Sequence, residues 1–122
     1  QQPGLYREDD MKLTKSLLVA GFLTLGLAGT ALAAVDEDAA KATGKRNDCF
    51  KCHAVDKTKK GPSYQKIAAK YKGKADGEEK LMKNITTGPK VKLEDGTEED
   101  HKIIDTKDPK ELKNLIAWIL SR

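Results

Sequence analysis

Between residues 63 and 122 the chain repeats apolar residues at helical spacing in three places. Intervals of three and four residues put such side chains on one face of a helix. The first stripe consists of Tyr64, Ile67, Ala68 and Tyr71. The second consists of Leu81, Met82 and Ile85, and the third of Leu112, Leu115, Ile116, Ile119 and Leu120. Each stripe predicts an amphipathic helix with one face turned to the protein core.

Residues that commonly begin and end helices flank these stripes. Ser63 can cap the first helix, and Gly73 ends it. Residues 76–79 (Asp-Gly-Glu-Glu) resemble a capping box before the second helix. Residues 108–111 (Asp-Pro-Lys-Glu) place Asp at the N-cap, Pro at N1 and Glu at N3 of the last helix. The alanine-rich residues 36–47 predict one further helix, so the chain predicts an all-α domain of about four helices.

Residues 86–108 stand apart from the helical segments. They contain Gly88, Pro89 and Gly96, many charges and few large apolar residues. No alternating strand pattern competes with the helical patterns in the chain, so we expect a loop here. A loop of this length is uncommon in a compact domain and tends to be functional.

The N-terminal part of the chain has the features of a secretory signal peptide. Residues 11–15 form a short basic segment, residues 16–30 an uncharged and mostly apolar run, and residues 31–33 (Ala-Leu-Ala) a small-x-small cleavage site. The apolar run is shorter than the roughly 20 residues that a membrane span needs, which favours cleavage over an uncleaved membrane anchor. Residues 1–10 are interpreted as an upstream extension. We therefore expect one mature domain, residues 34–122, in the periplasm and without a stable membrane span.

Composition adds two constraints to this small domain. A domain of this length buries a modest core and usually needs a staple such as a disulfide or a metal. The chain has only two cysteines and a net charge of +4. The positive charge favours partners with acidic docking surfaces. No basic run interleaves with aromatic residues, so nucleic acid is not expected as a partner.

Both cysteines belong to residues 49–53, Cys-Phe-Lys-Cys-His. Cys-x-x-Cys followed at once by His is the attachment signature of c-type haem. Two thiols about one helical turn apart can each form a thioether bond to a vinyl group of one haem, and His53 can then fill an axial position of the iron. A thioredoxin-like redox pair would need a strand–helix unit around the motif. A zinc site would need two more ligands, and His101 alone cannot complete four-coordination. The motif favours one haem c held covalently through Cys49 and Cys52, which would also be the staple.

The order of motifs resembles the small bacterial branch of the class I cytochromes c over essentially all of residues 34–122. It runs from an N-terminal helix through residues 49–53, 60–64 (Lys-Gly-Pro-Ser-Tyr) and 67–71 (Ile-Ala-Ala-Lys-Tyr) to the closing residues 115–120 (Leu-Ile-Ala-Trp-Ile-Leu). The resemblance implies a class I cytochrome c fold, in which the terminal helices cross and the helices wrap one covalently bound haem.

The resemblance also assigns roles to individual residues. His53 would be the proximal ligand of the iron, and the carbonyl of Pro62 would orient its imidazole. Tyr64 and Trp118 would pack in the core or against the haem. A hydrogen bond from either of these two side chains to a haem propionate is the alternative.

The sixth ligand is where this chain departs from the family pattern. The family normally places a Met in the loop before the final helix. No Met lies in residues 86–122, and His101 stands 17 positions before Trp118, in that loop. Met82 lies on a predicted helix instead, which favours a core residue packing against haem over an iron ligand.

His101 therefore has three interpretations. It can be the distal ligand of a bis-histidine haem, an exposed loop histidine without a role, or a pH-sensitive and partly occupied ligand. The absence of a competing Met favours the first, although three acidic residues precede it: Glu98, Glu99 and Asp100. Nearby lysines are poorer ligands, because a lysine must first lose a proton whose pKa is about 10.

Imidazole in place of a thioether stabilises ferric iron, so we expect a reduction potential below that of Met-ligated relatives. The expected function is that of a periplasmic electron carrier, not an enzyme, which passes single electrons to redox partner proteins. Lysines near the motif can guide acidic partners or form an ordinary solvated surface; they are Lys51, Lys57, Lys59 and Lys60. The alternative function is a haem protein with an open or labile sixth site that binds or senses small gaseous ligands.

Overall fold

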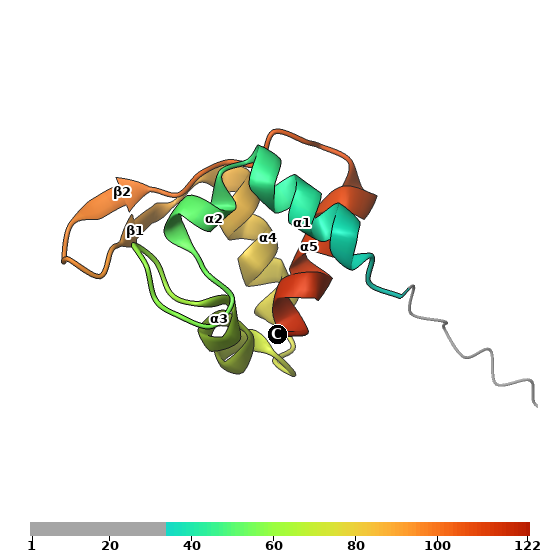
Figure 1. Cartoon of the computed structure of the whole chain (residues 1–122), viewed down its shortest axis with the longest axis horizontal. Coiled ribbons are helices and arrows are strands. Elements are labelled where there is room, and N and C mark those ends of the chain that lie inside the picture. The colour runs from blue at the N-terminus through green and yellow to red at the C-terminus, as the bar shows by residue number, and fades with distance from the viewer. Residues whose placement is uncertain (1–33) are drawn as a thin grey trace, which may run out of the picture. The chain divides into compact units, whose positions relative to one another are not determined.

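Seven elements follow one another in the computed structural model, which describes residues 34–122. They are α1 (Glu37–Arg46), α2 (Cys49–Cys52), α3 (Tyr64–Tyr71), α4 (Gly77–Thr87), β1 (Lys90–Lys92), β2 (Glu98–Asp100) and α5 (Pro109–Leu120) (Figure 1). The expected extension and signal peptide lie outside the described residues and stay predictions. Among residues 34–122, no helix is long and apolar enough to cross a membrane.

The helix ends follow the predicted caps at two positions. The Ser63 side chain accepts a hydrogen bond from the Lys66 amide at 3.1 Å, and the Asp108 carboxylate accepts one from the Lys110 amide at 2.9 Å. Asp76 also occupies an N-cap position, but its side chain makes no capping hydrogen bond and pairs with Lys80 at 2.7 Å. The capping box predicted there is therefore absent, because the carboxylate bonds to a lysine one turn further along α4.

The terminal helices α1 and α5 pack against each other, as the resemblance implies, and α3 and α4 both pack on α5. The predicted stripe of α5 forms the centre of the core: Leu115 and Ile116 are 1% exposed and Trp118 is fully buried. Ala40 of α1 is also fully buried, so small and large side chains meet where the two terminal helices pack. The C-terminal end of α1 leads directly into the cysteine motif.

The prediction that residues 86–108 form a loop without strands was wrong in the middle of that segment. β1 and β2 form an antiparallel hairpin in which Lys90 faces Asp100 and Lys92 faces Glu98. The chain reverses at Gly96, whose φ of 87° lies in the left-handed region that favours glycine. Strands of three residues are too short to show a clear alternation. The Asp95-Gly96 pair is nevertheless a known hairpin signal.

Candidate haem site

The two cysteines lie on the single turn of α2, which brings both thiols to the same end of the domain. Both thiols are half-buried and neither is in a disulfide. His53 follows at once, and its amide donates to the Cys49 carbonyl at 2.9 Å. Burial raises the pKa of the Cys49 thiol. Two free thiols on one helical turn, followed directly by an imidazole, fit a group that forms two thioether bonds.

The imidazole of His53 is held in one orientation by two neighbours. Its Nδ1 lies 2.6 Å from the Pro62 carbonyl oxygen, and its ring stacks on Tyr64 with 5.3 Å between ring centroids. Since a carbonyl oxygen only accepts, Nδ1 carries the proton and the lone pair of Nε2 is left for a metal. Burial lowers the pKa of His53, which favours the neutral, ligating form. This geometry fits the role of an iron ligand oriented by Pro62.

The loop after His53 folds back closely over the motif. The Gly61 amide donates to the Cys52 carbonyl at 2.8 Å, and the Lys59 ammonium donates to the Phe50 carbonyl at 2.6 Å. A Cβ atom added to Gly61 would lie 2.8 Å from Cε1 of the His53 ring. Only glycine at position 61 therefore lets the backbone pass this close to the imidazole.

Phe50 of the motif packs with two aromatic rings of the core. Phe50, Tyr64 and Trp118 contact one another edge to face, with centroid separations of 5.2 to 6.1 Å. Tyr64 is 2% exposed, and Trp118 is fully buried with the Arg122 guanidinium 5.0 Å from its ring centroid. The indole Nε1 is buried without a hydrogen-bond partner within the described residues. The structure thus brings Tyr64 next to His53 and Trp118 next to Tyr64, and their contact with haem stays a prediction.

His101 lies directly after β2 and faces His53 across the site. The centroids of the two imidazole rings are 6.3 Å apart, and the ring planes differ by 41°. The His101 amide donates to the Pro89 carbonyl at 2.8 Å, and its Nδ1 lies 3.0 Å from the Lys102 carbonyl oxygen. Nδ1 can therefore act as the donor, which leaves Nε2 without a proton. The two histidines, 48 residues apart in sequence, meet because the hairpin returns the chain to the motif.

Met82 lies on a helix and not in the segment that carries His101. It belongs to α4, is half-buried, and packs against the core cluster. This position agrees with its prediction as a core residue. Its contact with haem is a prediction that the structure leaves untested.

The charges near the motif are more mixed than the lysine-rich sequence indicates. Lys51 pairs with Asp48 at 3.2 Å, and the Lys59 ammonium is bonded to the backbone of α2. Residues of the hairpin and of the lysine loop line a small pocket together: Lys59, Lys60, Leu93, Glu94, Asp95 and Glu99. Acidic groups of the hairpin therefore stand beside Lys59 and Lys60, two of the four candidate docking lysines.

Comparison with known proteins gives consistent results over this whole region. The family model described as cytochrome c matches residues 37–122. The cytochrome c-552 of Hydrogenobacter thermophilus is 34% identical over 109 residues, which cover 89% of this chain and 98% of that protein.

Two solved structures are similar to this one. The class 1 cytochrome MtoD from Sideroxydans lithotrophicus ES-1 is 58% identical with a TM-score of 0.69, covering 72% of this chain and 97% of that one. Wild-type cytochrome c552 of Nitrosomonas europaea is 30% identical with a TM-score of 0.54, covering 66% of this chain and 96% of that one.

Proposed function

Because this chain belongs to the cytochrome c family, as a small class I c-type cytochrome, we propose that it carries single electrons between periplasmic proteins through a bis-histidine haem of lowered potential. The family and the class I cytochrome c fold are those predicted from the sequence. The protein is an electron-transfer haem protein, and one haem c is attached covalently through Cys49 and Cys52.

The separation of the two imidazoles is the observation that carries the ligand assignment. A metal binds an imidazole nitrogen at about 2.0 Å, which puts the ring centroid about 3 Å from the metal. Two imidazoles on opposite sides of one metal therefore have centroids about 6 Å apart. The rings of His53 and His101 are 6.3 Å apart. This agreement supports His53 as the proximal and His101 as the distal ligand.

When bound, the haem supplies iron that cycles between ferric and ferrous states and so takes up or releases one electron. His53 is kept in the ligating tautomer by Pro62, and buried apolar side chains of α4 and α5 keep water from the protein side of the site. With an imidazole in the distal position, we expect a potential below that of Met-ligated relatives. Family membership favours this carrier over a protein that senses gaseous ligands through an open sixth site.

Export and partner choice complete the proposal. The signal-like residues 11–33 support a periplasmic location, where the haem would be attached after export. The net charge of +4 supports partners with acidic docking surfaces. Lys57 best serves this role among the four lysines near the motif, because it is exposed, makes no ion pair within residues 34–122 and, unlike Lys59 and Lys60, does not line the pocket with acidic residues of the hairpin.

Electron paramagnetic resonance of the ferric holoprotein tests the ligand assignment. We expect a low-spin bis-imidazole signal that becomes high-spin in His101→Ala. Lys102→Ala is the matched control, since it removes the neighbouring candidate ligand and should leave the signal unchanged. A high-spin parent, or a low-spin signal that survives in His101→Ala, would reject His101 as the sixth ligand.

A further inference from the structure

Three hydrogen bonds hold the backbone around His101. The amides of His101 and Ile104 donate to the carbonyls of Pro89 and Ile85, at 2.8 and 2.9 Å. The amide of Asp105 donates to Oδ1 of Asn47 at 2.8 Å. The third bond differs from the first two, because its acceptor is a side chain and lies at the end of α1. Residues 101–105 have no regular secondary structure of their own, so these bonds define where the segment lies.

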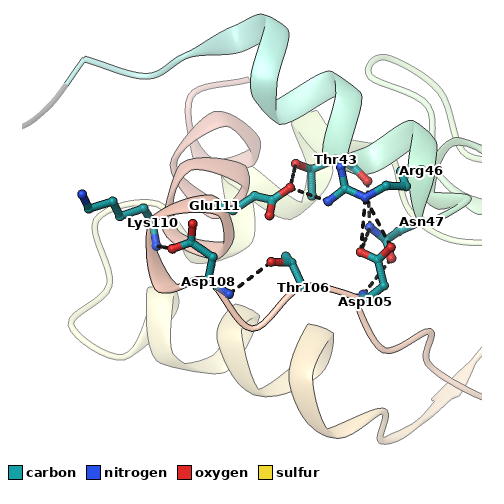
Figure 2. Close-up of polar contacts among 8 residues, drawn as sticks. All are labelled: Thr43, Arg46, Asn47, Asp105, Thr106, Asp108, Lys110 and Glu111. Atoms are coloured by element: carbon teal, nitrogen blue, oxygen red, sulfur yellow. Dashed lines mark hydrogen bonds and ion pairs between the residues drawn. The ribbon is translucent and has the colours of Figure 1, made fainter.

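The side chain of Asn47 is buried and fully used. It is 2% exposed, and its Nδ2 donates to the Thr43 carbonyl at 2.9 Å and to Oδ1 of Asp105 at 3.0 Å. With Oδ1 bound to the Asp105 amide, both N–H groups and the oxygen of the carboxamide have partners. Figure 2 shows this carboxamide meeting Asp105 in a two-point contact. Breaking that contact would leave buried polar groups without partners, which is costly.

A second set of contacts surrounds this pair but is more exposed (Figure 2). The Arg46 guanidinium donates to the Asp105 carboxylate at 3.3 Å and also to Glu111, while the Thr43 hydroxyl donates to Glu111 at 2.8 Å. The Arg46 side chain is 47% exposed, and exposed ion pairs contribute little. The buried carboxamide of Asn47 is therefore the main attachment of the segment to α1.

We propose that Asn47 is a positioning residue for the distal ligand and limits how readily His101 leaves the iron. The inference rests on the proposed function, since it takes His101 as the sixth ligand. We take departure of His101 from the distal position to involve a shift of residues 101–105, and such a shift breaks the contact between Asn47 and Asp105. Local opening of this kind has a free energy set by the bonds that it breaks. Asn47 therefore acts on the haem site from α1 without touching it.

Carbon monoxide binding to the reduced holoprotein measures this opening. At saturating carbon monoxide the observed rate is limited by departure of the sixth ligand. We expect Asn47→Ala to raise this rate about tenfold, because the part-buried Asp105 amide loses its acceptor and the Asp105 carboxylate loses one of its donors, which together weaken the closed arrangement by about that factor.

Asn114→Ala is the matched control. Like Asn47, Asn114 uses its carboxamide both as donor and as acceptor toward one residue. It makes two hydrogen bonds to the backbone of Asp36, at 2.8 and 2.9 Å, and so joins α5 to the start of α1. The control thus loses the same chemical groups at a place that does not contact residues 101–105. We expect its rate to stay within about twofold of the parent, because neither lost hydrogen bond holds residues 101–105.

Amide hydrogen exchange of the holoprotein gives a second readout that needs no added ligand. The Asp105 amide should be protected in the parent although it lies outside helices and strands, and it should exchange about tenfold faster in Asn47→Ala. If Asn47→Ala yields no folded holoprotein, Asn47→Asp replaces it. That variant keeps the acceptor for the Asp105 amide, loses both donors, and should also accelerate carbon monoxide binding.

Failure of this inference is distinguishable from failure of the proposed function. A low-spin parent whose signal depends on His101, together with equal carbon monoxide rates in Asn47→Ala, Asn114→Ala and the parent, would overturn the role of Asn47 alone. An unprotected Asp105 amide in the parent would do the same. A high-spin parent would overturn both proposals.

Discussion

The two histidines that face each other are held by different means. His53 is fixed through its side chain: Pro62 accepts from the ring at 2.6 Å, Tyr64 stacks on it, and Gly61 passes too close to allow a Cβ. His101 is placed mainly through its backbone, which is attached to residues of α4, of the hairpin base and of α1. The proximal side is therefore held by contacts of the His53 ring itself, and the distal side by hydrogen bonds to the backbone around His101.

The surroundings of the two sides differ in the same sense. Behind His53 lies the aromatic cluster of Phe50, Tyr64 and Trp118, which belongs to the core. Next to His101 lies a charged hairpin, seen in orange at one edge of the helices in Figure 1. Its second strand is exposed at all three positions. Substitutions should accordingly damage the proximal side more than the distal side.

Removal of both thiols is expected to have the largest effect. Cys49→Ala combined with Cys52→Ala should abolish covalent haem, since no other cysteine exists in the chain. The measurement is haem staining of the protein after denaturing electrophoresis. Lys51→Ala lies between the two cysteines, has a side chain that is 76% exposed, and should keep full staining. Covalent haem in the double variant would contradict the site.

Gly61→Ala tests how closely the proximal side is packed. The added methyl carbon would stand 2.8 Å from the His53 ring and must displace it, at a cost of about 1–3 kcal/mol, with a change in the haem spectrum. Gly96→Ala is the comparison: its φ of 87° is strained, but a Cβ meets nothing within 4 Å. It should lower the melting temperature modestly and leave the spectrum unchanged. Equal spectra for both variants would show that His53 is not sterically fixed.

His101→Met tests whether the distal ligand can be exchanged while the fold is kept. A thioether favours ferrous iron, so the midpoint potential should rise by on the order of 100 mV, within the about 0.8 V that axial ligands span. Voltammetry of the holoprotein measures the change. Lys102→Met adds the same side chain one residue further on and should leave the potential as in the parent. A potential unchanged by His101→Met would mean that His101 is not a ligand.

The parts of the structure that sequence reasoning predicted depend on neighbours close in the chain. Each cap, at Ser63 and at Asp108, involves residues within about one turn of helix, and so does the cysteine motif. The stripe of α5 repeats intervals of the same length. The family resemblance then supplied the crossing of α1 and α5. Within residues 34–122, the structure has one helix more than the four predicted. This extra helix is α2, the cysteine motif itself in a single helical turn.

The parts that were missed depend on residues far apart. Asn47 and Asp105 are separated by 58 positions, and nothing near either residue indicates the other. Lys59 was one of four candidate docking lysines, with an ordinary solvated surface as the alternative. Its ammonium is instead bonded to the Phe50 carbonyl, a contact that exists only once the loop has folded back. The hairpin differs from these cases. Its turn residues, Asp95 and Gly96, are a signal in the sequence, but its three-residue strands are too short to show an alternating pattern.

Glu111→Gln is expected to have the smallest effect and to depend on pH. Arg46, as the main cause, lowers the pKa of Glu111 to about 2 from its usual 4.5. A carboxylate with a lowered folded-state pKa stabilises the fold fully above about pH 4.5, and this contribution is lost as the pH falls through about 2. The melting temperature of Glu111→Gln should therefore be a few degrees below that of the parent at pH 7, and the difference should shrink between pH 4.5 and 2.

Glu79→Gln is a matched control for the charge at a helix start. Glu79 occupies the same N3 position in α4 as Glu111 does in α5, and it makes no ion pair within residues 34–122. Both substitutions remove a negative charge that the helix dipole favours, so this shared effect cancels between them. What remains in Glu111→Gln is the contact with Arg46, through which α5 reaches the end of α1 beside Asn47. If the melting temperature of Glu111→Gln stays below that of Glu79→Gln by the same amount at pH 2, the effect comes from packing and not from charge. The contacts around Asn47 would then depend on packing, as the surroundings of His53 do.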